Sequence, residues 1–294
     1  MGQSDLQSKF TASLKTSLKY LVCARALNIK LRVGFILFLS ILLIGFIGPF
    51  FIPYNPIRTG IFPRNLPPSL EHPFGTDSLG RDILAQIIVG TKMSLVIGIL
   101  VSVFGHILGL GLGFISGYYG GKIDTIIRNV IDVFLAIPSL PMLILIASYI
   151  RVRTIWTIIF ALVPWSWAFC ARQVRGQTLS LRSREFIYMA KLSGMSGWEI
   201  ILREIAPHMG LWIIGSFANG VLVAIMAESG MEILGIGPAR TITLGMILFW
   251  AQFHSALFAG LWWWLFAPTM MLIIIFVSLF LIHVGFEEAL RQRR

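Results

Sequence analysis

The sequence has little charge and almost no cysteine. Asp, Glu, Lys and Arg make up 13% of its 294 residues, whereas 56% of the residues are hydrophobic. Soluble domains carry about 25% charged residues, so this chain has too few to cover the surface of a soluble particle. The composition excludes a cytosolic enzyme, a disordered chain and a secreted disulfide scaffold, and it indicates a polytopic membrane protein.

Motifs for catalysis, metal binding and cofactor binding are also missing. The two cysteines, Cys23 and Cys170, form no CxxC pair, and the five histidines are scattered without an HExxH motif. Residues 120–123 lack both the Ser or Thr and the upstream Gly of a phosphate loop. We therefore expect no catalytic, metal or cofactor site in this chain, so transport energy must come from another chain or from an ion gradient.

Six long apolar stretches are present instead, each near the roughly 20 residues that span the hydrocarbon core of a bilayer. They are residues 33–52, 94–118, 130–150, 154–171, 211–228 and 265–285. The sequence thus predicts an all-α membrane protein with six transmembrane helices. Its expected divisions are a cytoplasmic amphipathic and basic segment (1–32), a first helix with an extracytoplasmic loop (33–93), a five-helix core with a cytoplasmic loop at 172–210 (94–285), and a cytoplasmic tail (286–294).

Basic residues are distributed unevenly about these spans. Of the 24 Lys and Arg residues, 17 fall in segments on the N-terminal side of the membrane and 7 on the other side. Cytoplasmic loops carry an excess of Lys and Arg, so both termini are predicted to be cytoplasmic. We expect the chain to lie in the lipid bilayer with this excess of Lys and Arg on its cytoplasmic side. The excess accounts for the net charge of +11, so no nucleic-acid partner is expected.

The second span carries a packing signal of small residues. Glycine recurs every four residues along it, at Gly105, Gly109, Gly113 and Gly117. Small residues at this spacing line one face of a helix and let a second backbone approach closely. We expect a tight helix–helix seam here, with a partner helix in this chain or in another subunit.

Two acidic residues and two prolines lie within or close to the predicted spans. Asp132 and Glu228 fall near span ends, so we expect a structural or interfacial role for them rather than a proton relay. Pro138 and Pro141 predict a kink in the third span, because proline interrupts helical hydrogen bonding.

The cytoplasmic loop 172–210 is too regularly patterned to be a linker. Apolar residues at helical spacing predict one short helix around residues 186–190 and a second around 198–205, with Gly194 between them and Pro207 at the end of the second. Two short helices held beneath the membrane form a rigid knob on which a cytosolic partner can act.

This knob resembles the EAA loop of binding-protein-dependent ABC importer permeases. The family pattern has Glu-Ala-Ala, a Gly a few residues later, and Ile-x-Leu-Pro beyond. Tyr188 and Met189 replace its Glu-Ala, Ala206 replaces its Leu, and Glu185-Phe186 matches a pair that often precedes the motif in the peptide branch. The residues that the resemblance implies in coupling to an ATPase are Glu185, Phe186, Tyr188, Met189, Ala190, Gly194, Ile205 and Pro207.

A second stretch, residues 72–82, reads HPFGTDSLGRD and follows the Pro-rich external segment 53–73. It resembles the signature of C-type subunits in the dipeptide/oligopeptide/nickel permease group. The matching signature residues are Gly75, Thr76, Asp77, Gly80, Arg81 and Asp82. Positions further along the chain fit the same group: Gly121, Asp124, Arg128, Asp132, Pro138, Glu228, Gly230, residues 234–237 and Gly245. Residues 280–285 depart from the pattern.

The resemblance implies a type I ABC importer permease in the inner or plasma membrane of a prokaryote. Its expected partners are a related B-type permease, two cytosolic ATPase subunits that bind ATP and Mg²⁺, and an extracytoplasmic solute-binding protein. Peptides are the expected solute, with oligosaccharides or nickel chelates as alternatives. An ion-gradient-driven secondary transporter is the alternative of a different class, but the inverted repeats with broken midplane helices that it requires are not visible in the sequence.

Overall fold

The computed structural model describes residues 28–150, 153–238 and 240–291, and in these ranges the regular elements are helices. The amphipathic segment expected over residues 1–32 lies outside the described residues as far as residue 27. The longer helices are α2 (Ile29–Ile47), α3 (Ile83–Tyr119), α4 (Gly121–Ala136), α5 (Ser139–Tyr149), α6 (Ile155–Arg182), α10 (Gly210–Ile233), α11 (Leu244–Phe253) and α12 (Trp262–Arg291). The shorter ones are the 3₁₀ turn η1 (Gly48–Phe51), α7 (Glu185–Leu192), α8 (Gly197–Ile200), the π-helical turn η2 (Ile201–Ile205) and α9 (Ala206–His208).

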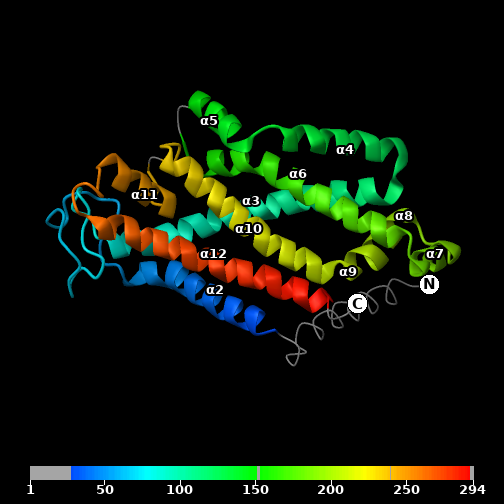
Figure 1. Cartoon of the computed structure of the whole chain (residues 1–294), viewed down its shortest axis with the longest axis horizontal. Coiled ribbons are helices and arrows are strands. Elements are labelled where there is room, and N and C mark those ends of the chain that lie inside the picture. Colours follow the sequence, from blue (N-terminus) through cyan, green and yellow to red (C-terminus); the bar gives the residue numbers. More distant parts are fainter. Residues whose placement is uncertain (1–27, 151–152, 239, 292–294) are drawn as a thin grey trace.

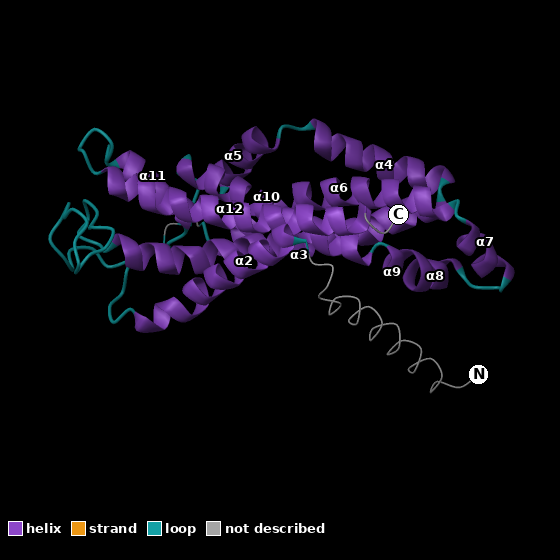
Figure 2. Ribbon diagram, turned by 60° about the horizontal axis from the view of Figure 1, so that its bottom comes forward, coloured by secondary structure: helices purple, strands orange, loops and turns teal. Residues whose placement is uncertain are grey.

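The helices form an elongated bundle (Figure 1). Within the described residues, five helices are long and apolar enough to cross a membrane, and α4 with α5 make a sixth if they count as one broken span. The loop that precedes α3 lies at one end of the bundle, and α7 and α8 project from the other (Figure 2). The six-span architecture expected from the sequence is therefore the one observed.

Helix α3 is longer than the sequence pattern indicated. Residues 83–93, expected in the external loop, form its first turns, because the Asp82 carboxylate accepts a hydrogen bond from the Ala85 N–H and caps the helix. At about 1.5 Å per residue, its 37 residues extend over roughly 55 Å. This length exceeds the hydrocarbon core, which is about 30 Å thick, so α3 extends beyond the core. It connects the loop that precedes it to the opposite end of the bundle (Figure 2).

The third span is broken rather than kinked. α4 and α5 meet at an angle of 81°. The break falls at Ile137, whose extended backbone (ψ 123°) fits the residue before a proline, because the ring of Pro138 disfavours helical geometry there. Pro141 sits in the first turn of α5, where a missing N–H costs nothing, so only one of the two prolines makes the break.

The four glycines of α3 face α6. A Cβ added at Gly105, Gly109, Gly113 or Gly117 would lie between 2.1 and 2.6 Å from a side-chain atom of that helix. The α6 residues that they meet also recur every four positions: Ser166, Cys170, Val174 and Thr178. The partner helix left open by the sequence therefore lies in this chain.

The remaining spans pack around this pair. Gly98 of α3 lies against Ile225 of α10, and Gly34 of α2 lies against Ile282 of α12. A cluster of buried aliphatic and aromatic side chains joins α2, α3, α10, α11 and α12, with Trp264 fully buried in it. The bundle is thus held together by small-residue contacts between neighbouring spans.

We expect Gly109→Leu to lower the yield of assembled complex several-fold, because its side chain would overlap the Cβ of Cys170 at 2.6 Å. Gly111→Leu is the matched control, since a Cβ there meets nothing within 4 Å. The measurement is the amount of membrane complex recovered by co-purification. Equal yields for the two variants would show that the close seam is dispensable.

Candidate functional site

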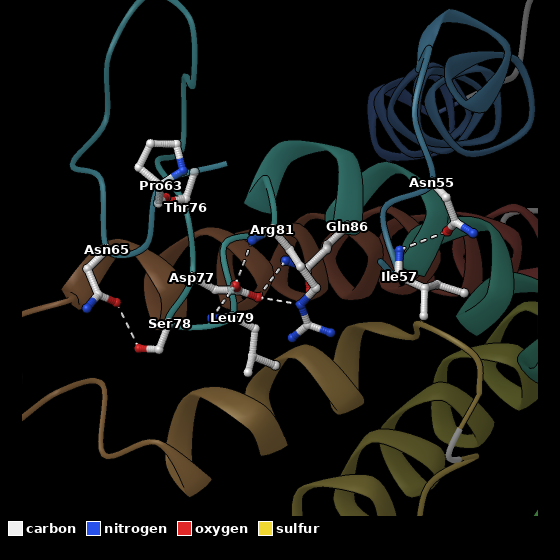
Figure 3. A network of polar contacts seen from close by, with 10 residues as sticks. All are labelled: Asn55, Ile57, Pro63, Asn65, Thr76, Asp77, Ser78, Leu79, Arg81 and Gln86. Carbon is white, nitrogen blue, oxygen red and sulfur yellow. Dashed lines mark hydrogen bonds and ion pairs between the residues drawn. The ribbon is translucent and has the colours of Figure 1, made fainter. Parts of the chain in front are cut away.

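The loop before α3 is organised around one buried carboxylate. Asp77 is fully buried and accepts four hydrogen bonds (Figure 3). They come from the backbone N–H groups of Leu79 (2.8 Å) and Arg81 (2.9 Å), the Arg81 Nε (2.7 Å) and the Gln86 amide (3.0 Å). Because Gln86 belongs to α3, this carboxylate joins the loop to the helix.

The other signature residues close the same loop. Thr76 donates to the carbonyl of Pro63 at 2.7 Å and accepts from the N–H of Leu66 at 2.9 Å. Asp82 caps α3 and also lies 2.6 Å from the Nδ1 of the buried His72. Each of these side chains therefore bonds within the loop or to the start of α3.

Gly75 and Gly80 allow the signature segment to lie directly against the backbone of residues 62–66. Both have positive φ, 69° and 70°, and a Cβ at either would lie 2.4 Å from a carbonyl oxygen, that of Leu66 or of Phe62. No side chain fits that distance, so the signature requires glycine at both positions. The six signature residues thus lie in one hydrogen-bonded loop, and together they build a platform at one end of the bundle.

At the opposite end, α7, α8, η2 and α9 form the knob. Residues 172–182, expected in the loop, continue α6 instead, so the knob comprises residues 183–209. α7 ends in a Schellman motif, in which the Met195 N–H donates to the Ala190 carbonyl and the Gly194 N–H to the Lys191 carbonyl. Gly194 has the positive φ of 78° that this motif needs.

The second part of the knob differs from expectation at Pro207. This residue does not end the helix, because a proline in a first helical turn lacks only an N–H that would be unpaired anyway. It lies in α9, directly after η2, where the Ala206 N–H donates to the Ile201 carbonyl five residues earlier. The backbone turns at Met209, and α10 follows.

One face of the knob is fixed to the bundle. Ile187, Ala190 and Ile205 are buried in a cluster with Phe114 of α3 and Val174 of α6. Phe186 stacks on His208 with ring centroids 4.4 Å apart. Near α8, a Cβ at Gly197 would meet the Tyr119 hydroxyl at 2.8 Å. The knob therefore packs as a rigid extension of α3 and α6.

The other face of the knob is exposed and apolar. Its large side chains are between 52% and 82% exposed: Tyr188, Met189, Leu192, Trp198 and Leu202. We call these five residues the apolar patch. Glu185 is also exposed, in the first turn of α7. Ser196 and Glu199 cap α8 reciprocally, and the hydrogen bonds from the Ser196 N–H and hydroxyl hold the pKa of Glu199 below its usual value.

Ion pairs fasten α4 to α6 near the knob. The guanidinium of Arg175 binds the Asp124 carboxylate in a bidentate arrangement, with Nη2 at 2.7 Å from Oδ2. Asp132 of α4 likewise pairs with Arg172 of α6. Both pairs therefore link α4 to α6.

Glu228 lies deeper than the sequence suggested. α10 continues to Ile233, so Glu228 is inside a helix and fully buried, with a hydrogen bond of 3.0 Å from Ser94 of α3. One turn further on, Glu232 is also fully buried and accepts a hydrogen bond from Thr243, the N-cap of α11. Glu232 is not among the residues expected from the sequence to lie in a span, although its spacing of four from Glu228 places both on one helix face.

These features describe one subunit of a multi-pass membrane protein, with the platform at one end of its helix bundle and the knob at the other. The family of binding-protein-dependent transport system inner membrane components matches residues 109–293, and the chain belongs to this family. It is 32% identical over 258 residues to the dipeptide transport system permease protein DppC of Bacillus subtilis (strain 168), which covers 87% of this chain and 80% of that protein.

A second relative is the oligopeptide transport system permease protein OppC of Mycobacterium tuberculosis (strain ATCC 25618 / H37Rv). It is 34% identical over 226 residues, 76% of this chain and 77% of that protein. The chain is therefore a membrane component of a transport system and not a catalyst.

We expect Asp77→Ala to open the platform, since it leaves the buried guanidinium of Arg81 without its carboxylate, a loss of about 3–5 kcal/mol in buried pairs. Tryptic cleavage at the exposed Arg58 and Arg64 should accelerate by more than about tenfold through local unfolding. Ser78→Ala is the control, because it removes one exposed hydrogen bond to Asn65. Equal cleavage rates for the two variants would contradict the role given to Asp77.

Proposed function

We propose that this chain is the C-type permease subunit of an ATP-driven peptide importer. It pairs with a related B-type permease, and the two surround the translocation pathway. Two cytosolic ATPase subunits, which hold ATP and Mg²⁺, dock below, and an extracytoplasmic binding protein delivers the solute above. The names of the relatives, a dipeptide and an oligopeptide permease, support peptides as the solute class.

The knob carries this proposal. Its apolar patch is exposed, in helices that project from one end of the bundle (Figure 2), so the bundle does not cover it. Exposed apolar surface of this kind is typical of a protein interface. Tyr188 and Met189, which replace the usual Glu-Ala, make this interface more apolar than a motif with a carboxylate would.

The packing of the knob explains how a partner could drive transport. Because Ile187 and Ile205 are buried against Phe114 and Val174, a force applied to the patch reaches α3 and α6 directly. These two helices share the glycine seam, so they move together. ATP-driven closure of the ATPase pair would then tilt the spans as rigid bodies and switch the access of the pathway from outside to inside.

The orientation follows from the charge distribution. With the knob and both termini in the cytoplasm, a cysteine at Lys191 lies inside and one at Arg64 lies outside. We expect a membrane-impermeant thiol reagent to modify Arg64→Cys but not Lys191→Cys in intact cells, in a chain whose Cys23 is replaced by Ser. The opposite labelling pattern would invert the topology and place the knob outside.

Gly194 tests the coupling role. Gly194→Asp adds a carboxylate beside the apolar patch, while Gly194→Asn adds an uncharged side chain of the same shape, and both residue types tolerate positive φ better than most. We expect normal insertion for both variants. Binding-protein-stimulated ATP turnover of the reconstituted complex should fall at least about tenfold for Asp alone, because a desolvated charge is costly at an apolar interface.

Two results would count against this role. Unchanged turnover and transport in Gly194→Asp would show that the knob is not the coupling element. An equal loss in both variants would assign the effect to the backbone of the turn and not to the interface.

A further inference from the structure

A cavity of about 360 Å³ lies between α3, the α4–α5 break, α6 and α10. Its volume is within the range of small-molecule pockets, about 300–1,000 Å³. Six residues of α6 and six of α10 line it, each set with the spacing i, i+3, i+4, i+7, i+8 and i+11 of a single helix face. Non-helical backbone at Ile137 and Pro138 completes the wall, an arrangement that membrane proteins tolerate where such backbone lines a cavity.

Hydrogen-bonding groups gather at the end of the cavity nearer the knob. α10 leads away from the knob, and its Ser216 and Asn219 precede Val223 by one to two turns. α6 runs toward the knob, and its Gln173 follows Leu162 by three turns. The opposite end of the cavity is mainly apolar, with Leu162, Val223 and Ala227, and its polar groups include the unpaired indole N–H of Trp165.

The amide groups of Asn219 and Gln173 are available to a ligand. Within the described residues, neither side chain takes part in a hydrogen bond. By contrast, His106 is held in place, since its Nδ1 lies 2.9 Å from the Ser102 carbonyl and its Nε2 lies 3.3 Å from the Ser216 hydroxyl. A carboxamide presents one acceptor and two donors, which match the N–H and carbonyl of a peptide group.

The wall carries no permanent charge. Among the 19 described residues that line the cavity, none is Asp, Glu, Lys or Arg. A fixed charge here would attract one class of charged solute and repel the other, strongly so at the low dielectric constant of a bundle interior.

We propose that Asn219 and Gln173 bind backbone amide groups of the peptide in transit, and that the uncharged wall makes passage independent of side-chain charge. This inference rests on the proposed peptide function. The amides supply contacts common to all peptides, while the apolar end accepts side chains without hydrogen-bonding to them.

The test is uptake of Ala-Ala-Ala, Ala-Asp-Ala and Ala-Lys-Ala by the complete complex in proteoliposomes, at pH 8, where an imidazole of ordinary pKa is neutral. The variants are Asn219→Asp and Gln173→Glu. Asn129→Asp is the matched control, because Asn129 is exposed on α4 and does not line the cavity. Each acidic-to-basic uptake ratio is divided by that of wild type, so that the preference of the binding protein cancels.

We expect this normalised ratio to fall at least about tenfold in both cavity variants and to stay near one in the control. The reason is repulsion between the new carboxylate and the acidic peptide, two like charges within roughly 6–8 Å at an effective dielectric constant near 20. An unchanged ratio in both cavity variants would overturn the inference. So would equal loss of all three peptides, because a damaged wall does not discriminate by charge. Failure of the proposed function looks different, since the wild-type complex would then take up none of the three peptides.

Discussion

The close approach of α3 and α6 is the contact on which the rest of the structure depends. Lipid offers helices no hydrophobic reason to associate, so their packing relies on how near two backbones can come. Four glycines in register remove every side chain from one face of α3, and the side chains of α6 fill that space. The knob packs on this same part of the two helices, because its buried residues cluster with Phe114 of α3 and with Val174, which itself faces Gly113.

The seam also explains the placement of the polar residues. Near the knob, Arg182 donates to the Tyr118 carbonyl at 2.9 Å, and Arg175 binds Asp124 just after α3 ends. At the other end, Ser94 joins α3 to Glu228. Each of these bonds joins helices that the apolar contacts already hold together, so the polar groups fix register and orientation. The cavity adjoins the seam, because Ser166 and Cys170 of α6 both meet the glycines of α3 and line the cavity.

Much of this architecture could be predicted from the sequence, because it follows from strong local signals. The six apolar stretches located the spans, the spacing of Gly105 to Gly117 located a packed face, and Gly194 marked a turn. Features set by tertiary contacts could not be found in this way. The start of α3 at Ile83 and the end of α10 at Ile233 both lie beyond the spans expected from the sequence, where Asp82 caps the first and Glu232, near the second, bonds to Thr243 at the start of α11.

The angle at Ile137 and the identity of the helix facing the glycines are further examples. A proline predicts an interruption, but whether the chain bends slightly or turns by 81° depends on what the second half packs against. Likewise, glycine spacing identifies a contact face without identifying its occupant. For the knob, the helix that follows Pro207 could not be foreseen, since proline both ends helices and occupies their first turns.

The length of α3 has a mechanical consequence. One continuous helix connects the loop held by Asp77 and Asp82 to the tyrosines that support the knob, so these two distant sites are the ends of a single lever. If the helix pivots at the centre of the glycine seam, a tilt of about 10° moves its Asp82 end by roughly 7 Å and its knob end by roughly 2 Å, in opposite directions, because the seam lies in the half of α3 nearer the knob. A small displacement at the knob would therefore produce a larger displacement of the platform without any change in the shape of the helix itself.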